Sequence, residues 1–250
     1  MILSARDIKF AYSKMEVLKK ISFDLVEGDC LAVLGTNGAG KSTLLKCLNK
    51  ILTPSKGVVY INGTDTNSLS DRKLAQTIGY IAQKHEHTRK TVFDTILLGR
   101  KPYVKWDITK RDIEVVESII SAFHLDDYAM RYADELSGGE LQKVMIARAL
   151  AQQPKVLLMD EPTSSLDLKN QLEVISTIRK VVKVQNISVV VTMHDLNLAL
   201  RLANKFLLMK DGKVLGYGGN EIITREAIKE VYDVNVAFME YEGTSVIVPV

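Results

Sequence analysis

The sequence predicts an α/β fold, in which a mostly parallel core sheet carries an N-terminal antiparallel β subdomain and an inserted α-helical subdomain. The continuous β-branched run at 187–192 indicates a strand buried on both faces, which is typical of parallel sheets covered by helices. Residues 21–25 alternate between apolar and polar, the period-two pattern of a half-buried strand. Between 84 and 153, apolar residues recur at helical spacing instead. We therefore expect a single domain over 1–250, with the helical subdomain at roughly 84–153.

The composition is that of an ordinary globular protein, with 46% hydrophobic and 25% charged residues in a chain of 250. Basic and acidic side chains are interleaved and the net charge is +3, so the charge pattern does not indicate a nucleic-acid binder. Cys30 and Cys47 lie in apolar segments and are expected to be buried thiols, consistent with a reducing cytosol. No signal peptide is visible, and no apolar run approaches about eighteen residues. We expect the protein to work in the cytoplasm, docked to another component.

The expected elements follow from these patterns and from the turn residues between them. Residues 1–28 are predicted to form antiparallel strands that end at a turn over 27–29. Tyr12 falls in a short polar interval between them, and taken alone it is interpreted as an ordinary loop aromatic. The remaining elements in chain order are strands over 30–34, 58–61 and 78–82, helices through 84–153, a strand over 155–160, a helix over 168–184, a strand over 187–192, a hairpin of 206–209 and 214–217, a helix near 224–232 and a last hairpin turning at 242–243.

A glycine-rich stretch at 35–43 fits the phosphate-binding pattern G-x-x-x-x-G-K-[ST], between a short buried strand and a helix pattern. Its glycines let backbone N–H groups turn inward as a nest for anionic oxygens, and the helix N-terminus adds a positive dipole end. Lys41 is expected to reach the β- and γ-phosphates of a nucleotide, and the Ser42 hydroxyl to ligate Mg²⁺. A glycine-rich turn that binds nothing is the less favoured interpretation. The residues predicted to bind here are Gly35, Asn37, Gly38, Ala39, Gly40, Lys41, Ser42 and Thr43.

A pair of carboxylates, Asp160 and Glu161, directly follows four apolar residues. Because Mg²⁺ prefers oxygen ligands and retains part of its hydration shell, Asp160 is predicted to hold the metal through water. Glu161 is predicted to polarise the attacking water. An acidic pair at a strand end is often only the start of a solvated loop, but the phosphate-binding stretch upstream favours the metal and base assignments.

A second glycine-rich turn opens a helix at 136–142, with Ser137 as its cap. Its helix N-terminus is another anion-binding surface. Considered alone, this stretch would be interpreted as a capped helix after a loop. A single nucleotide needs one phosphate-binding surface, and this chain carries two.

Together these elements resemble the nucleotide-binding subunit of an ATP-binding cassette (ABC) transporter, a P-loop NTPase of ABC type. The resemblance implies an ATP hydrolase with ATP and Mg²⁺ as cofactors. It also implies a head-to-tail homodimer, in which each ATP lies between the phosphate loop of one copy and residues Ser137, Gly138, Gly139 and Glu140 of the other. The matching elements, which occur in family order over nearly the whole chain, are residues 35–43, Gln83, residues 136–140, Asp160 with Glu161, residues 164–167 and His194.

The resemblance implies roles for single residues. Tyr12 matches the aromatic residue that stacks on adenine, which replaces its interpretation as an ordinary loop residue. Gln83 matches the residue that contacts Mg²⁺ and senses the γ-phosphate. Asp167 matches the residue that links the two sites across the dimer, and His194 matches the switch histidine expected to contact the γ-phosphate. The implied catalytic residues are Glu161, His194 and Gln83, and the implied metal ligands are Ser42, Gln83 and Asp160.

The sequence departs from the family pattern at two positions. Glu140 stands where Gln is usual, and Ser165 stands where Ala is usual. Neither change removes a ligand that the chemistry needs, and both bear on the contact between the subunits. His85 and His87 are separated by Glu86 with no third ligand nearby, so a metal pair there is not favoured.

The stretch 91–103, with residues 166–171 and 193–197, resembles importers of metal chelates: iron-siderophores, haem and cobalamin. Relatives that import molybdate or tungstate remain an alternative. The implied partners are integral membrane permease subunits, a second copy of the chain and, indirectly, a substrate-binding protein, at the cytoplasmic face of the membrane. Two interpretations of the next charged segment are equally favoured: it docks a cytoplasmic helix of the permease, or it is a solvated loop. The residues concerned are Arg100, Lys101, Lys105 and Trp106.

Other functions fit the motifs less well. A soluble, non-transport ABC ATPase acting on ribosomes or DNA is expected to carry two cassettes or a long coiled coil, and the sequence shows neither. A small-molecule kinase would leave residues 136–140 without a role. A non-hydrolysing regulatory module is disfavoured because Glu161 and His194 are both present. The tail after Tyr217 is too short for the regulatory barrel that some sugar importers carry.

Overall fold

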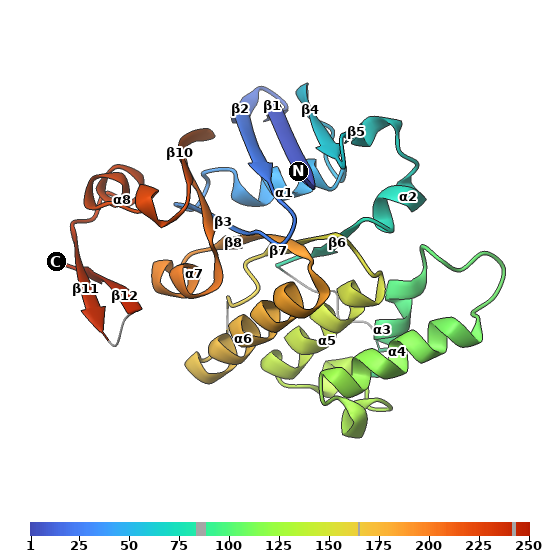
Figure 1. Cartoon of the computed structure of the whole chain (residues 1–250). Coiled ribbons are helices and arrows are strands. Elements are labelled where there is room, and N and C mark those ends of the chain that lie inside the picture. The colour runs from blue at the N-terminus through green and yellow to red at the C-terminus, as the bar shows by residue number, and fades with distance from the viewer. Residues whose placement is uncertain (84–88, 165, 242–243) are drawn as a thin grey trace.

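The computed structural model describes residues 1–83, 89–164, 166–241 and 244–250 (Figure 1). Its centre is a six-stranded sheet in the order β10-β9-β3-β8-β7-β6. All neighbouring pairs are parallel except β10 with β9, which confirms the mostly parallel core. The strands are β3 (Cys30–Gly35), β6 (Ile78–Ile81), β7 (Val156–Asp160), β8 (Ser188–Met193), β9 (Lys205–Lys210) and β10 (Lys213–Gly218).

An antiparallel sheet in the order β2-β1-β4-β5 forms the N-terminal β subdomain, as predicted. Helix α1 (Lys41–Leu48) lies between this sheet and the core sheet, and its Leu44 and Leu45 are fully buried in one apolar cluster with Ile8 of β1 and Val190 of β8. Packing on both sides holds the start of α1 in place. The strands of this subdomain are β1 (Leu3–Tyr12), β2 (Met15–Leu25), β4 (Lys56–Ile61) and β5 (Thr64–Asp65).

The hairpin of β1 and β2 is tighter than the sequence suggested. Tyr12 is the last residue of β1 and pairs with Met15 across a two-residue turn, so its predicted position in a polar interval between strands is wrong. Ser13 adopts a left-handed conformation with φ of 52°, which such short hairpin turns require. Pairing between β1 and β2 extends to the turn, because hydrogen bonding between the two strands, and not the polarity of nearby residues, determines where β1 ends.

Helices cover the other face of the core sheet (Figure 1). Ile146 of α5, Val174 of α6 and Ala199 of α7 are fully buried in one cluster with Met159 and Val191 of the sheet. Among the helices of the described residues, none combines the length and the apolar character needed to cross a membrane. The helices on this side are α5 (Gly138–Ala151), α6 (Leu168–Gln185), α7 (Leu196–Leu202) and α8 (Arg225–Tyr232).

The expected helical subdomain is present. Across residues 89–153, the described part of that segment, the chain forms helices and turns with one isolated bridge between Thr91 and Tyr132. Val92, Val116 and Val144, one from each of its main helices, are fully buried in a cluster of their own. The elements are α3 (Val92–Leu97), η2 (Leu98–Arg100), α4 (Lys110–Ala122), η3 (Asp126–Tyr128), η4 (Ala133–Glu135) and α5.

Several short elements were not predicted from the sequence: β5, η1 (Thr66–Ser68), α2 (Asp71–Ala75), α7 and η5 (Asn220–Ile222). They are too short to show a hydrophobic period. The available signals were capping residues. Ser70 accepts a hydrogen bond from the Lys73 N–H at 3.3 Å, and Asp195 accepts one from the Leu198 N–H at 2.9 Å.

The C-terminal segment follows the prediction. Thr224 caps α8 and accepts a hydrogen bond from the Ala227 N–H at 3.1 Å. Strands β11 (Val236–Tyr241) and β12 (Thr244–Pro249) form the expected hairpin, whose turn at 242–243 lies outside the described residues. Cys30 and Cys47 are buried free thiols as expected, and burial raises the pKa of each to about 12.

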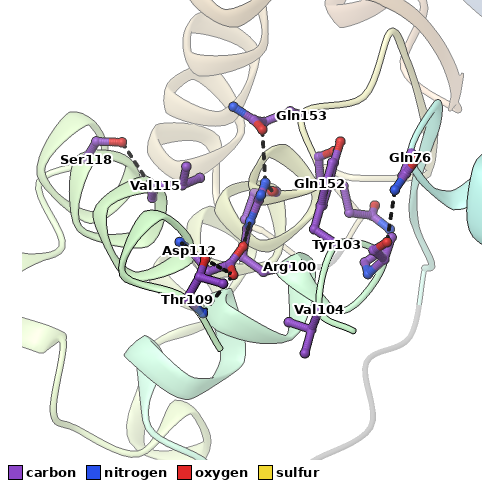
Figure 2. A network of polar contacts seen from close by, with 12 residues as sticks. Gln76, Arg100, Tyr103, Val104, Thr109, Asp112, Val115, Ser118, Gln152 and Gln153 are labelled. Atoms are coloured by element: carbon purple, nitrogen blue, oxygen red, sulfur yellow. Dashed lines mark hydrogen bonds and ion pairs between the residues drawn. The ribbon is translucent and has the colours of Figure 1, made fainter. Parts of the chain in front are cut away.

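Arg100 is part of the interior of the helical subdomain (Figure 2). It is 3% exposed, and its guanidinium donates to Asp112 Oδ1 at 2.9 Å and to the Ala151 carbonyl at 2.7 Å. The loop that follows is tied to the core by Gln76 Nε2, which donates to the Pro102 carbonyl at 3.0 Å. Neither interpretation offered for Arg100, a docking residue or part of a solvated loop, fits the structure, because its side chain is buried and its charge is paired inside the chain.

Candidate active site

The phosphate-binding stretch forms the turn between β3 and α1, as predicted. Gly40 has a φ of +99°, and a Cβ there would lie 2.9 Å from Leu18 Cδ2. A Cβ at Gly35 would lie 2.3 Å from the Met209 carbonyl oxygen. Larger residues would disrupt these close approaches, so the pattern needs glycine at both ends of the loop.

The Lys41 side chain lies across the loop that precedes it. Its Nζ donates to the carbonyl oxygens of Gly35 at 2.8 Å and Thr36 at 3.1 Å, and the residue is 5% exposed. Burial lowers the pKa of Lys41, and the nearby carboxylates of Glu161 and Asp160 oppose that shift. The ammonium group is thus placed at the loop that is predicted to hold the phosphates.

The predicted metal residues Ser42 and Asp160 are in contact. Ser42 Oγ donates to Asp160 Oδ1 at 2.9 Å. Thr192 Oγ1, from the neighbouring strand β8, donates to the same oxygen at 2.7 Å. Asp160 is 3% exposed, so these hydroxyls supply the hydrogen bonds that its burial requires.

These oxygens suit a hard cation such as Mg²⁺. The described residues contain no group of three or more His, Cys, Asp or Glu that could hold a metal ion. The hydroxyl of Ser42 and the carboxylate of Asp160 are oxygen donors, which fit an ion that takes its other ligands from water and phosphate, as Mg²⁺ does. His85 and His87, like Ser165, lie outside the described residues.

The three predicted catalytic residues meet at one carboxylate. Gln83 Nε2 donates to Glu161 Oε2 at 2.5 Å, and His194 Nε2 contacts Glu161 Oε1. Glu161 has a left-handed backbone with φ of 49°, and its N–H donates to Thr192 Oγ1 at 2.9 Å. Strained backbone of this kind is concentrated at functional sites.

Thr192 is a site residue that the sequence interpretation missed. It is fully buried and bridges Asp160 to the backbone of Glu161. The only signal was a hydroxyl residue within the apolar run at 187–192, where Thr is also a common strand former.

Ser137 caps α5 in a capping box with Glu140, as the sequence suggested for Ser137. Glu140 Oε2 accepts from the Ser137 hydroxyl at 2.6 Å and from its N–H at 2.9 Å. These hydrogen bonds, with smaller effects of the Tyr128 hydroxyl and the Arg131 charge, lower the pKa of Glu140. The departure from Gln at this position thus places a carboxylate beside the Ser137 hydroxyl.

The start of α5 packs closely on the start of α6. A Cβ at Gly139 would lie 2.3 Å from Asn170 Oδ1, and one at Gly138 would lie 3.5 Å from Leu166 Cδ2. Asp167 caps α6 and accepts from the Asn170 N–H at 2.8 Å. Residues predicted for the subunit contact therefore lie side by side in one chain.

Two separate groups of predicted residues result. Lys41, Ser42 and Asp160 lie with Glu161, whereas no hydrogen bond among the described residues joins Ser137 to that group. Tyr12 is 44% exposed at the tip of the β1–β2 hairpin, with its ring centroid 4.8 Å from that of Phe10 in an edge-on contact. The assigned roles of all these residues stay predictions.

Known proteins resemble the chain over its whole length. The model of the ABC transporter family matches residues 18–164. An uncharacterised ABC transporter ATP-binding protein, MJ0089 of Methanocaldococcus jannaschii, is 51% identical over 250 residues, which are 100% of this chain and 98% of that protein. The petrobactin import ATP-binding protein FpuC of Bacillus anthracis is 31% identical, over 94% of this chain and 88% of that protein.

Solved structures agree with these sequence matches. An ABC transporter assigned to the metal-chelate type, in an inward-facing conformation, has a TM-score of 0.87 and 32% identity, covering 100% of this chain and 97% of that one. The dimeric ATP-binding cassette MJ0796 in a post-hydrolysis state with ADP and Pi has a TM-score of 0.76 and 26% identity, covering 87% of this chain and 98% of that one.

Proposed function

Because the chain belongs to the ABC transporter family and is one of its ATP-hydrolysing subunits, we propose that it drives an importer of a metal chelate. The chelate class comprises iron-siderophores, haem and cobalamin. Similarity to a petrobactin import protein and to a transporter of metal-chelate type supports this choice over molybdate or tungstate. The observation that carries the ATPase part is the Glu161 carboxylate, held beside the phosphate loop by Gln83 and His194.

The residues of the phosphate loop bind the nucleotide. Lys41 turns its ammonium from the loop carbonyls to the β- and γ-phosphates, whose charge replaces these weaker acceptors. Ser42 and Asp160 hold Mg²⁺, which neutralises phosphate charge when bound. Tyr12, exposed at a hairpin tip, stacks on the adenine ring.

Glu161 is the general base. Its carboxylate accepts the proton of the attacking water, and Gln83 and His194 orient it through its two oxygens. Contact with both oxygens leaves the carboxylate few orientations, so its lone pairs point at a fixed position. Gln83 and His194 therefore connect the base to the region where the γ-phosphate binds.

A second copy of the chain completes each site. The N-terminus of α5, with Ser137 as its cap, provides N–H donors for a phosphate of the partner's ATP. Asp167, next to it at the start of α6, links the two sites of the dimer. The dimeric cassette MJ0796, which resembles this chain, supports the arrangement.

The helical subdomain faces the permease at the cytoplasmic side of the membrane. A groove of about 730 Å³ between the core sheet and this subdomain is lined by Ala82, Leu98 and Met145, among others, and lies next to Gln83. On the adjoining loop, Trp106 is 99% exposed and flanked by the exposed Lys105, which suits contact with another protein. A substrate-binding protein delivers the chelate to the permease, away from this chain.

The test is to purify the chain with its co-purifying membrane subunits, reconstitute the complex in vesicles and measure ATP hydrolysis with different solutes. We expect an iron-siderophore, haem or cobalamin to stimulate the rate. Molybdate or tungstate as the only stimulating solute would refute the chelate assignment, and co-purification with ribosomes in place of membrane subunits would refute the importer. The Glu161→Gln complex serves as the control without hydrolysis.

A further inference from the structure

A second hollow lies between α6, α7 and the C-terminal hairpin of β11 and β12. Its volume is about 820 Å³, within the range of roughly 300–1,000 Å³ that small-molecule sites occupy. Four cationic side chains line it, and none of its described lining residues is Asp or Glu. We term it the basic groove, after its residues Arg179, Lys180 and Lys183 of α6 and Arg201 of α7.

The four cations of the basic groove have no ion-pair or hydrogen-bond partner among the described residues, whereas Lys143 on α5 pairs with Glu173 at 2.6 Å. Arg179 and Lys183 are four residues apart on one helix face, where like charges repel each other. An anion in the groove would relieve that repulsion.

Stabilisation of the helix ends does not account for the whole cluster. Lys183 and Arg201 lie in the last turns of α6 and α7, where the helix dipole favours cations. Arg179 and Lys180 lie before the last turn of α6, and the dipole effect falls off within that turn. These two exposed side chains have no helix-end role and are therefore available to an anion that enters the groove.

The basic groove is separate from the active site, and one of its sides is held in place by hydrogen bonds. Arg179 follows the α6 cap Asp167 by twelve residues, about 18 Å along the helix axis. The hairpin that closes one side is held to α7 by Asn197, which donates to the Ile247 carbonyl at 3.1 Å and accepts from its N–H at 2.8 Å. On this wall Tyr241 is 70% exposed and lines the groove.

From this geometry we propose that the basic groove binds a small polyphosphorylated anion. The planar guanidinium groups of Arg179 and Arg201 match phosphate oxygens two at a time, and the lysines add point charges. Such an anion is either an inorganic polyphosphate or a nucleoside polyphosphate. The exposed ring of Tyr241 is placed to stack on the base of a nucleoside polyphosphate, whereas an inorganic polyphosphate has no base to contact it.

The test uses the full chain carrying Lys41→Ala, which removes the main phosphate contact of the active site. Sodium tripolyphosphate is titrated by calorimetry at constant salt with EDTA. We expect one site per chain. Adding Arg179→Gln and Lys183→Gln is expected to raise its dissociation constant about tenfold or more, because one hydrogen bond to a charged group is worth at least that factor.

The matched control adds Lys73→Gln and Lys213→Gln, which remove the same charge from exposed positions that do not line the groove and are expected to change affinity less than about twofold. The proposal is overturned if tripolyphosphate does not bind, or if the two pairs of substitutions have equal effects in chains that melt at the same temperature. Repeating the titration with ATP identifies the source. If Tyr241→Ala weakens the binding of ATP but not of tripolyphosphate, the ligand is a nucleoside polyphosphate. If Tyr241→Ala changes the affinity for neither, the ligand is an inorganic polyphosphate.

Discussion

Gln83 and His194 hold opposite oxygens of one carboxylate: Gln83 Nε2 donates to Glu161 Oε2 at 2.5 Å, and His194 Nε2 contacts Oε1. The three residues follow β6, β7 and β8, which are neighbours in the core sheet. Since these strands are parallel, their carboxyl ends lie at one edge and bring the three side chains together. The orientation of Glu161 is therefore set by residues from both adjoining loops.

Replacing Glu161 by Gln is expected to lower the rate of ATP hydrolysis by roughly 10²–10⁴-fold, the loss typical of a general base. Glutamine keeps the shape and one acceptor oxygen, so binding of ATP should be retained. Phosphate release and nucleotide fluorescence measure the two quantities. Glu173→Gln, which breaks only the surface pair with Lys143, is the control and should hydrolyse ATP normally. An unchanged rate in Glu161→Gln would remove Glu161 from the role of base.

Replacing Thr192 by Val is expected to lower the free energy of unfolding by about 1–3 kcal/mol, because the Asp160 carboxylate and the Glu161 N–H each lose a buried partner. Urea denaturation measures the change. The matched control is Thr95→Val: Thr95 is also buried, but its hydroxyl has no hydrogen-bond partner in the part of the chain that the structure describes, so valine should cost no stability. Equal losses in the two variants would show that the Thr192 hydroxyl contributes nothing specific.

Replacing Asp112 by Asn is expected to cost about 3–5 kcal/mol, since it leaves the buried Arg100 guanidinium without its counter-charge. Chemical denaturation at neutral pH measures the loss. Glu114→Gln, which removes the exposed pair with Lys110, is the control and should change stability by less than about 1 kcal/mol. If Asp112→Asn were as stable as the wild type, the buried pair could not be a structural element of the loop.

The same carboxylate predicts a pH dependence. Hydrogen bonding to Thr109 and then the Arg100 guanidinium hold the pKa of Asp112 below its ordinary value of 3.8, against the opposing effect of burial. The folded state therefore binds this proton less readily than the unfolded chain. Stability from Asp112 is fully present above pH 3.8 and is lost as pH falls through the lower folded pKa. Acid titration of stability should show this loss in the wild type and not in Asp112→Asn.

Replacing Glu140 by Gln is expected to strengthen ATP-dependent dimerisation. A Gln carbonyl can accept the same two hydrogen bonds from Ser137, so the cap of α5 remains. The substitution removes a negative charge from the helix end that we propose to bind the phosphates of the partner's ATP. One charge contact in water is worth about 1 kcal/mol, which is roughly a fivefold change at low salt. Analytical ultracentrifugation with ATP in the Glu161→Gln background measures it. Glu135→Gln, outside the cap, is the control. A dimer dissociation constant that is the same with Glu140 and with Gln at this position at low salt would contradict the prediction.

Much of the site was predictable because its chemistry is local in sequence. Other atoms approach Gly35 and Gly40 so closely that only glycine fits at these two positions. The phosphate-binding pattern can therefore be recognised in the sequence without a structure. Arg100 shows the opposite case. A charged residue in a connecting segment is usually exposed, and nothing near it in sequence indicates that Asp112 and the Ala151 carbonyl enclose it.

The sequence by itself determined the element types, the phosphate loop and the identity of the residues at the strand ends, because hydrophobic period, glycine and capping chemistry act over a few neighbouring residues. Only the tertiary structure decided which side chains meet. Gln83 and His194 are 111 positions apart, and both contact Glu161. They meet because the order and register of the parallel strands β6, β7 and β8 bring the loops that follow these strands together at one edge of the core sheet. The same packing gave Asp160 its partner Thr192 and left the cations around Arg179 without an ion pair among the described residues, since ion pairing depends on distances between elements that no local pattern records.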